Sequence, residues 1–347
     1  MQNSKITWVG CDVSKDKFNV AVKLPVVPEK HSSVKEISVD EFLLTEGGVA
    51  GFKNWLFYLK GKVGAEAVAV HVVMEATGRY SKQLYILMRK EMPKILVSIE
   101  NPKNICNYIK SLKHKNKTDN LDAKALLQYG FERKPKLYNE LPVEYEHLRE
   151  LTRQRTAMDL QLTAAKLRFK EISTFDDIAK IQRQVINVLK KGIAKVEKLI
   201  RECVEQSQEL SESVDHATTI QGVGFITATT VLAECGPLYE HSSRELSAYS
   251  GLAPYLRQSG TSVNSSKISH AGPRRLRQVL YMASIVVTKY DGPLRNIYKR
   301  LIRQGRKPMQ ARCAVMRKLL ILIRAVVVNK TAYFVEYKKA EVFHNVA

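Results

Sequence analysis

The chain has 347 residues, enough for two domains, and its 45% hydrophobic and 26% charged residues are ordinary for a folded protein. It lacks a long apolar run, a signal-peptide pattern and a CxxC cysteine pair, which argues against a membrane span, secretion and a zinc or disulfide framework. Lysine and arginine total 56 against 34 acidic residues, a net charge of +22, so we expect a cytoplasmic protein that binds nucleic acid. A basic protein of unrelated function is the alternative.

The first 140 residues alternate between strand and helix patterns. Apolar and alternating runs predict strands, and a one-sided apolar stripe predicts each helix. We expect strands at 6–13, 17–24, 34–40, 67–74 and 94–99, and helices at 51–62, 81–90 and from Asp119 to about Gly130. Strands followed by alternating helices and strands predict a mixed α/β sheet domain.

The rest of the chain has mainly helical patterns. Residues 143–221 contain no proline, and apolar residues recur there at spacings of three and four from Ile178 to Cys203. This stripe predicts a helical hairpin, either part of a plain bundle or a coiled coil that joins subunits. Further on we expect a glycine turn and helix within 218–235, an exposed loop at 255–273, and helices at 274–289 and 309–328. The expected parts are therefore 1–140, 141–214 and 215–347.

Four acidic residues stand where strands and a helix would bring them together. Asp12 and Glu75 each end an apolar strand, and Asp119 and Asp122 share one face of a helix. Converging carboxylates repel unless cations bind between them, and oxygen ligands suit Mg²⁺ or Mn²⁺. Two such cations stabilise the attacking and leaving oxygens of phosphoryl transfer. Taken singly, Asp12 fits a turn residue, Asp119 a helix cap and Asp122 a solvated acid in the first helical turn.

Basic residues and a glycine turn predict contacts with phosphate. Residues 251–347 hold 19 basic and 3 acidic side chains, net +16, whereas residues 1–50 have net −1. The glycines of the GVG turn, Gly222 and Gly224, would let backbone N–H groups approach a phosphate, or they simply form a turn between packed helices. Before Asp119 lies a basic run that either binds phosphate or forms a solvated face: Lys110, Lys113, Lys115 and Lys117.

Six sequence blocks in order resemble one known family. VGCDVSKDKFNVAV, MEATGRYSKQLYILM and NPKNICNYIKSLKHKNKTDNLDAKAL resemble the N-terminal blocks of IS110-type transposases, which Piv-type DNA invertases share. TIQGVGFITATTVLAECG, AYSGLAPYLRQSG and KISHAGPRRLRQVLYMA resemble the C-terminal transposase domain. The resemblance implies a RuvC-like, ribonuclease-H-related N-terminal domain. Its acidic tetrad falls on Asp12, Glu75, Asp119 and Asp122.

The same resemblance implies a serine nucleophile, which falls on Ser259 in the RQSG motif. The residues alone do not single it out, because other serines stand close by: Ser262, Ser265, Ser266 and Ser269. Side chains expected to bind the exchanged phosphate are Arg257, Lys267, Arg274, Arg275 and Arg277. Two positions depart from the family pattern, since His270 stands where lysine is frequent and Pro273 where a polar residue is common.

The resemblance also implies partners. A structured guide RNA, the bridge RNA encoded by the element, would pair with donor and target DNA, so that base pairing selects the sequence. We expect a homo-oligomer, because recombination handles two DNA partners. The alternatives are a Piv-like invertase, a junction resolvase that uses water in place of serine, and a catalytically inactive nucleic-acid-binding protein, which the intact acid set disfavours.

Overall fold

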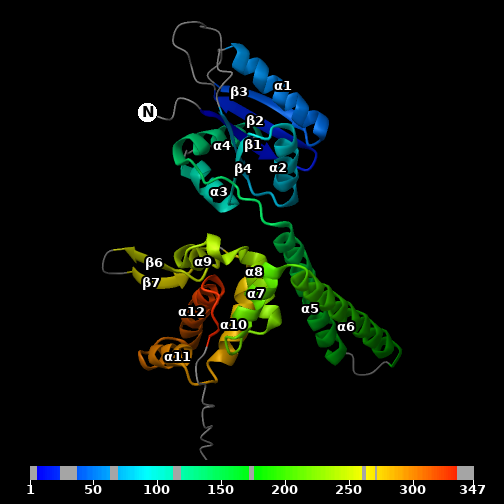
Figure 1. The fold of residues 1–347 in the computed structure, drawn as a ribbon, viewed down its shortest axis with the longest axis vertical. Coiled ribbons are helices and arrows are strands. Elements are labelled where there is room, and N and C mark those ends of the chain that lie inside the picture. Colours follow the sequence, from blue (N-terminus) through cyan, green and yellow to red (C-terminus); the bar gives the residue numbers. More distant parts are fainter. Residues whose placement is uncertain are drawn as a thin grey trace, which may run out of the picture. The chain divides into compact units, whose positions relative to one another are not determined.

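The computed structural model describes residues 6–23, 37–62, 69–111, 119–171, 176–259, 263–269 and 272–333. The chain forms two compact units, Met1–Glu140 and Leu141–Ala347, drawn in blue to green and in green to red in Figure 1. In the part of the chain that the structure describes, no helix combines the length and apolar character needed to cross a membrane.

The N-terminal unit is built on a five-stranded mixed sheet with the order β3-β2-β1-β4-β5. Strands β1 to β3 are antiparallel neighbours, whereas β1, β4 and β5 run parallel. The strands are β1 (Ile6–Val13), β2 (Lys17–Lys23), β3 (Ile37–Leu43), β4 (Ala69–Glu75) and β5 (Leu96–Glu100). The helices are α1 (Glu46–Lys62), α2 (Arg79–Glu91), α3 (Pro102–Ser111) and α4 (Asp119–Arg133).

Helices cover both faces of this sheet, and for that reason its central strands are buried over most of their length. Helices α1 and α2 pack on one face with Val9 and Cys11, and helices α3 and α4 pack on the other face with Trp8 and Val73 (Figure 1). On the second face Gly10 allows a close approach, since a methyl group added there would lie 2.0 Å from the carbonyl oxygen of Ala123 in α4. The α4 backbone therefore rests directly on β1.

The C-terminal unit is mainly helical. Its helices are α5 (Val143–Glu171), α6 (Asp176–Glu205), α7 (Gln208–Thr218), α8 (Phe225–Cys235), α9 (Ser243–Tyr249), α10 (Arg274–Val287), α11 (Pro293–Arg303) and α12 (Pro308–Val328). Helices α5 and α6 lie side by side as a hairpin (Figure 1). The base of the hairpin, with Leu148 and Ile200, belongs to the same core as Leu232, Leu280 and Leu320 of the following helices.

Residues 255–273, expected as a loop, instead contain a two-stranded antiparallel hairpin. Strand β6 (Pro254–Ser259) pairs with β7 (Val263–Ile268) in a register that places Leu256 opposite Ser266. The expectation was wrong because PYLRQS and VNSSKI lack the alternation of apolar and polar residues that a half-buried strand shows. Backbone pairing can form a hairpin without that pattern.

Candidate active site

Asp12 and Glu75 lie level with each other at the ends of two neighbouring parallel strands. The register pairs Cys11 of β1 with Met74 of β4, and Asp12 and Glu75 are the next residues along the two strands. Side chains alternate along a strand, so Asp12 shares a face with Gly10, which contacts α4. Both carboxylates are half-buried. They therefore project from the sheet on the side that α4 covers.

Helix α4 brings the second pair of acids toward the same end of the sheet. Gly130, late in α4, lies against Trp8, whereas Ala123, early in the helix, lies over Gly10. The helix therefore runs antiparallel to β1, and its first turn extends toward Asp12. Asp122 belongs to this turn and is half-buried. Asp119 begins the helix, and its side chain lies outside the described residues.

The other face of β1 is chemically different. Cys11 is fully buried there with Val9 and Val13, and burial, followed by the charge of Asp12, raises the pKa of its thiol well above the usual range. The thiol stays protonated and is a poor ligand for hard cations, which prefer oxygen. Without the thiol, the metal ligands available at this end of the sheet are oxygen atoms, which fit Mg²⁺ or Mn²⁺. Among the side chains whose placement is described, no three of His, Cys, Asp or Glu form a preformed metal site.

A further acid, Glu100, lies in this row but was not among the site residues predicted from the sequence. It pairs in register with Glu75 and is half-buried at the end of β5. Asn104 donates a hydrogen bond to it at 3.3 Å, and Tyr129 of α4 donates another. The signal was available, since Glu100 follows an apolar strand as Asp12 and Glu75 do. Asn104 and Tyr129 partner the Glu100 carboxylate within the protein.

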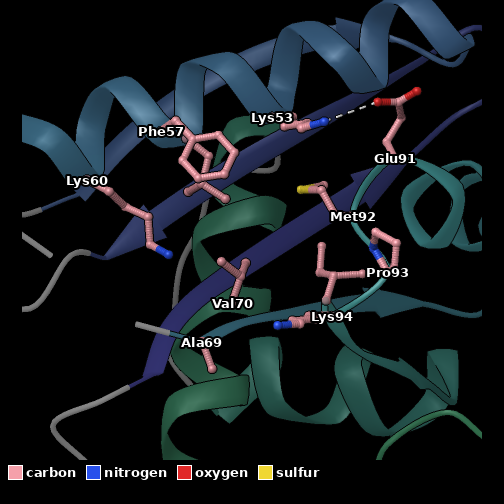
Figure 2. Close-up of a pocket in the computed structure, with 11 residues that line it drawn as sticks. Lys53, Phe57, Lys60, Ala69, Val70, Glu91, Met92, Pro93 and Lys94 are labelled. Carbon is pink, nitrogen blue, oxygen red and sulfur yellow. Dashed lines mark hydrogen bonds and ion pairs between the residues drawn. The ribbon is translucent and has the colours of Figure 1, made fainter. Parts of the chain in front are cut away.

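A pocket of about 670 Å³ lies at the opposite end of this unit's sheet (Figure 2). It lies between α1 and the turn before β5, and an ion pair of 3.5 Å between Lys53 and Glu91 crosses one side of it. Its wall includes Ala69, the first residue of β4, whereas Glu75 is the last. Six residues of strand span about 20 Å, so this pocket is separate from the carboxylates.

Ser259 is the last residue of β6 and pairs in register with Val263 at the start of β7. Two of the expected phosphate-binding residues lie on the same hairpin, because Arg257 pairs with Ser265 and Lys267 with Tyr255. The side chains of these residues lie outside the described part, as do His270 and the lysines at 113, 115 and 117. Lys110 is exposed at the end of α3.

The three arginines at the start of α10 have different surroundings. Arg275 Nε donates to Glu234 Oε1 at 3.1 Å, and Arg153 Nε donates to the same oxygen at 3.3 Å. Glu234 is only 1% exposed; burial raises its pKa, but the hydrogen bonds and charges of the two arginines outweigh burial and lower it. Arg277 donates to the backbone oxygens of Ser250 and Gly272, whereas Arg274 is exposed.

The two glycines of the GVG turn also differ. Gly222 has a φ of +88°, and a methyl group there would lie 3.0 Å from the backbone nitrogen of Val287 in α10. Gly224 precedes α8 as its N-cap, and a methyl group there would meet nothing within 4 Å. The positive φ and the close contact with α10 therefore both favour glycine at position 222. The second glycine is exposed at the N-terminus of α8, where the first backbone N–H groups have no partner within the helix.

Comparisons with known proteins identify the family of this chain. The family described as Transposase IS116/IS110/IS902 matches residues 214–299, and a DEDD transposase family of IS110 type matches residues 9–174. The Pilin gene-inverting protein of Moraxella bovis is 31% identical over 261 residues, which cover 74% of this chain and 80% of that protein. The chain belongs to the IS110 transposase family. The transposase is also 27% identical over 237 residues to the Transposase for insertion sequence element IS1111A of Coxiella burnetii, covering 60% of this chain and 63% of that one. It is an enzyme of the transposase and recombinase class.

Proposed function

We propose that this transposase cuts and rejoins DNA through a serine-linked intermediate, with divalent cations held by Asp12, Glu75, Asp119 and Asp122. The observation that carries the proposal is the alignment of Asp12 and Glu75 beneath the first turn of α4. The mixed sheet, with an acid at the end of its central strand, supports a RuvC-like fold for residues 1–140.

The reaction follows from the chemistry of Ser259. Its Oγ attacks a DNA phosphorus, an Oγ–P bond forms, and the P–O bond to the neighbouring nucleotide breaks. The serine proton passes to solvent, and the released nucleotide oxygen takes one up. A hydroxyl of a second strand then attacks the phosphoserine ester, which restores a P–O bond and the free serine. Cations at the carboxylates supply positive charge for the phosphate oxygens when bound.

The C-terminal part supports a polyanion-binding role. Residues 251–347 carry net +16, and Arg274 is exposed at the start of α10. We propose that this region, 215–347, holds donor and target DNA together with a structured guide RNA, and that residues 141–214 form the connecting helical hairpin. The positive charge favours phosphate backbones of either nucleic acid.

We also propose that α6 joins subunits. Ile186 and Ile193 are buried toward α5, but Ile181, Val185 and Val188 are 61%, 42% and 68% exposed. Their spacing of four and three places them on one strip of the helix. An exposed apolar strip of this kind fits a second copy of the chain.

A trapped-intermediate assay tests the serine mechanism. Wild-type protein should form a covalent adduct with a cleaved DNA end, whereas Ser259→Ala should bind DNA but neither form the adduct nor cut. Ser265→Ala, on the paired strand of the same hairpin, is the matched control and should keep the adduct. Cutting by Ser259→Ala would favour a water nucleophile, as in a junction resolvase.

A second assay separates the metal site from folding. Asp12→Asn, Glu75→Gln, Asp119→Asn and Asp122→Asn should each fold normally and lose strand exchange. Full activity of both Asp119→Asn and Asp122→Asn with Mg²⁺ would refute the tetrad.

DNA inversion is the second candidate function. It is favoured by the inverting relative from Moraxella bovis, since the similarity covers 80% of that protein. A reporter with an invertible segment, compared with a donor and target pair, separates the two. Products from the inverted reporter alone would identify an invertase.

A further inference from the structure

Asn19 lies beside Asp12 on the sheet face that α4 covers. The antiparallel register of β1 and β2 pairs Asp12 with Asn19 and Gly10 with Ala21. Paired residues project to the same side of a sheet, and Ala21 packs with Ala123 of α4. Asn19 is two residues from Ala21 and so shares that face. Its side chain is therefore the lateral neighbour of Asp12, opposite to Glu75.

The carboxamide oxygen of Asn19 is an anomaly in this position. Asn19 is only 4% exposed, and its Oδ1 is buried without a hydrogen-bond donor among the described residues. Buried polar atoms are almost always hydrogen-bonded, because an unpaired one loses its interaction with water without compensation. Glu100, at the other end of the same row, has two protein donors. The Asn19 oxygen without a donor therefore lies beside Asp12, at the end of the row away from Glu100.

An oxygen that meets no N–H or O–H group suits a cation. Hard divalent cations accept carbonyl and amide oxygens alongside carboxylates. A neutral donor is also favoured here, because Asp12, Glu75 and Glu100 already form a level row of acids, and a fourth charge would add repulsion. We propose that Asn19 Oδ1 is an additional, neutral ligand of the cation held by Asp12. This inference rests on the proposed metal site.

The test compares two buried oxygens on neighbouring strands. Asn19→Leu removes the amide oxygen at similar volume. Thr7→Val is the matched control, since Thr7 Oγ1 is likewise buried without a partner among the described residues, but Thr7 lies on the opposite face of β1 from Asp12. Thermal unfolding is followed with and without MnCl₂ in the absence of DNA, and the Mn²⁺ Kd is measured by calorimetry or by the loss of the free-ion paramagnetic resonance signal.

The expected results differ for the two variants. Without cation, both should unfold at or above the wild-type temperature, because each loses an unpaired buried oxygen. With MnCl₂, Thr7→Val should show the wild-type rise, whereas Asn19→Leu should lose most of it and bind Mn²⁺ at least about tenfold more weakly, the effect of removing one ligand-shell partner. Asn19→Asp, which keeps an oxygen, should retain binding.

An unchanged Mn²⁺ Kd in Asn19→Leu would overturn the inference. Asn19→Ala provides the same comparison if the leucine variant does not fold. The Asp12→Asn variant tests the metal site itself, whereas Asn19→Leu tests only the role of Asn19. If Asp12→Asn abolishes Mn²⁺ binding and Asn19→Leu does not weaken it, only the assignment of Asn19 is wrong. If neither variant changes the Kd, the metal site itself is wrong.

Discussion

Replacing Arg275 tests whether it supports the fold or binds DNA. Arg275 and Arg153 both donate to Glu234, which is 1% exposed in α8. Arg275→Ala removes one of these donors and leaves the carboxylate with Arg153 alone. With both arginines present the pKa of Glu234 is lowered on balance, so the carboxylate of the wild-type protein is charged near neutral pH.

The size of the effect follows from burial. Removing one partner of a fully buried ion pair costs about 3–5 kcal/mol. Here Arg153 remains, and the Arg275 side chain is 39% exposed, so solvent screens part of its charge. We expect Arg275→Ala to lower the free energy of unfolding by about 1–2 kcal/mol. A depressed pKa gives stability that is present above the unfolded value near 4.3 and lost as pH falls through the folded value, so the difference should shrink in acid.

Urea unfolding and DNA titration at low salt provide the measurement. Arg274→Ala is the matched control, since Arg274 is the exposed neighbour on the same helical turn. It should weaken DNA binding and change the free energy of unfolding by no more than about 0.5 kcal/mol. The reasoning would be refuted if Arg275→Ala unfolded like the wild type and lost more DNA affinity than Arg274→Ala.

Four other predictions concern the two units. Gly10→Ala should destabilise the N-terminal unit by about 3 kcal/mol or more and abolish strand exchange, because the added methyl group meets the α4 backbone; thermal unfolding and a cleavage assay check this, and a normal melting temperature would contradict it. His71 is buried and its pKa is lowered by burial to about 4, so the unfolding free energy should fall by about 3 kcal/mol from pH 6.5 to 4, and His71→Gln should flatten that slope. Gly222→Ala should destabilise the C-terminal unit by about 1 kcal/mol or more because of its positive φ, whereas Gly224→Ala should unfold normally; equal urea midpoints for the two would refute the packing role. DNA affinity should fall steeply with salt because of the +16 charge of residues 251–347, and a Kd that is flat from 50 to about 200 mM salt would contradict phosphate binding there.

The fold of the N-terminal unit was predicted mainly from its strand patterns. Apolar runs ending in Asp12 and Glu75 gave both the strands and the position of the acids, and β1 lies at 6–13 as expected. Helix α1 begins at Glu46, five residues earlier than expected, because Gly47 and Gly48 read as helix breakers. A methyl group at Gly48 would lie 2.0 Å from the backbone oxygen of Leu43, so this glycine serves a close approach that only the fold reveals.

Pairings between distant segments could not be predicted in the same way. Arg275 was expected to bind phosphate from its place in the basic C-terminal motif, but its buried partner Glu234 stands 41 residues earlier in the chain. The alternating pattern of its strand gave no sign that Asn19 belongs to the site. The strand register shows that it lies next to Asp12. Local patterns report which face a residue prefers, whereas the identity of its neighbours depends on the fold.

The hairpin of α5 and α6 also sets a distance. Ile200 is fixed in the core of the C-terminal unit, and Ile181 of the exposed strip lies 19 residues earlier on the same helix. At a rise of 1.5 Å per residue this separation is about 28 Å, close to the length of eight base pairs of DNA. A second copy that docks on the strip is therefore held at a defined spacing from this core. Because α6 packs along α5, lengthening both helices by two turns would change that spacing by about 11 Å while keeping their pairing.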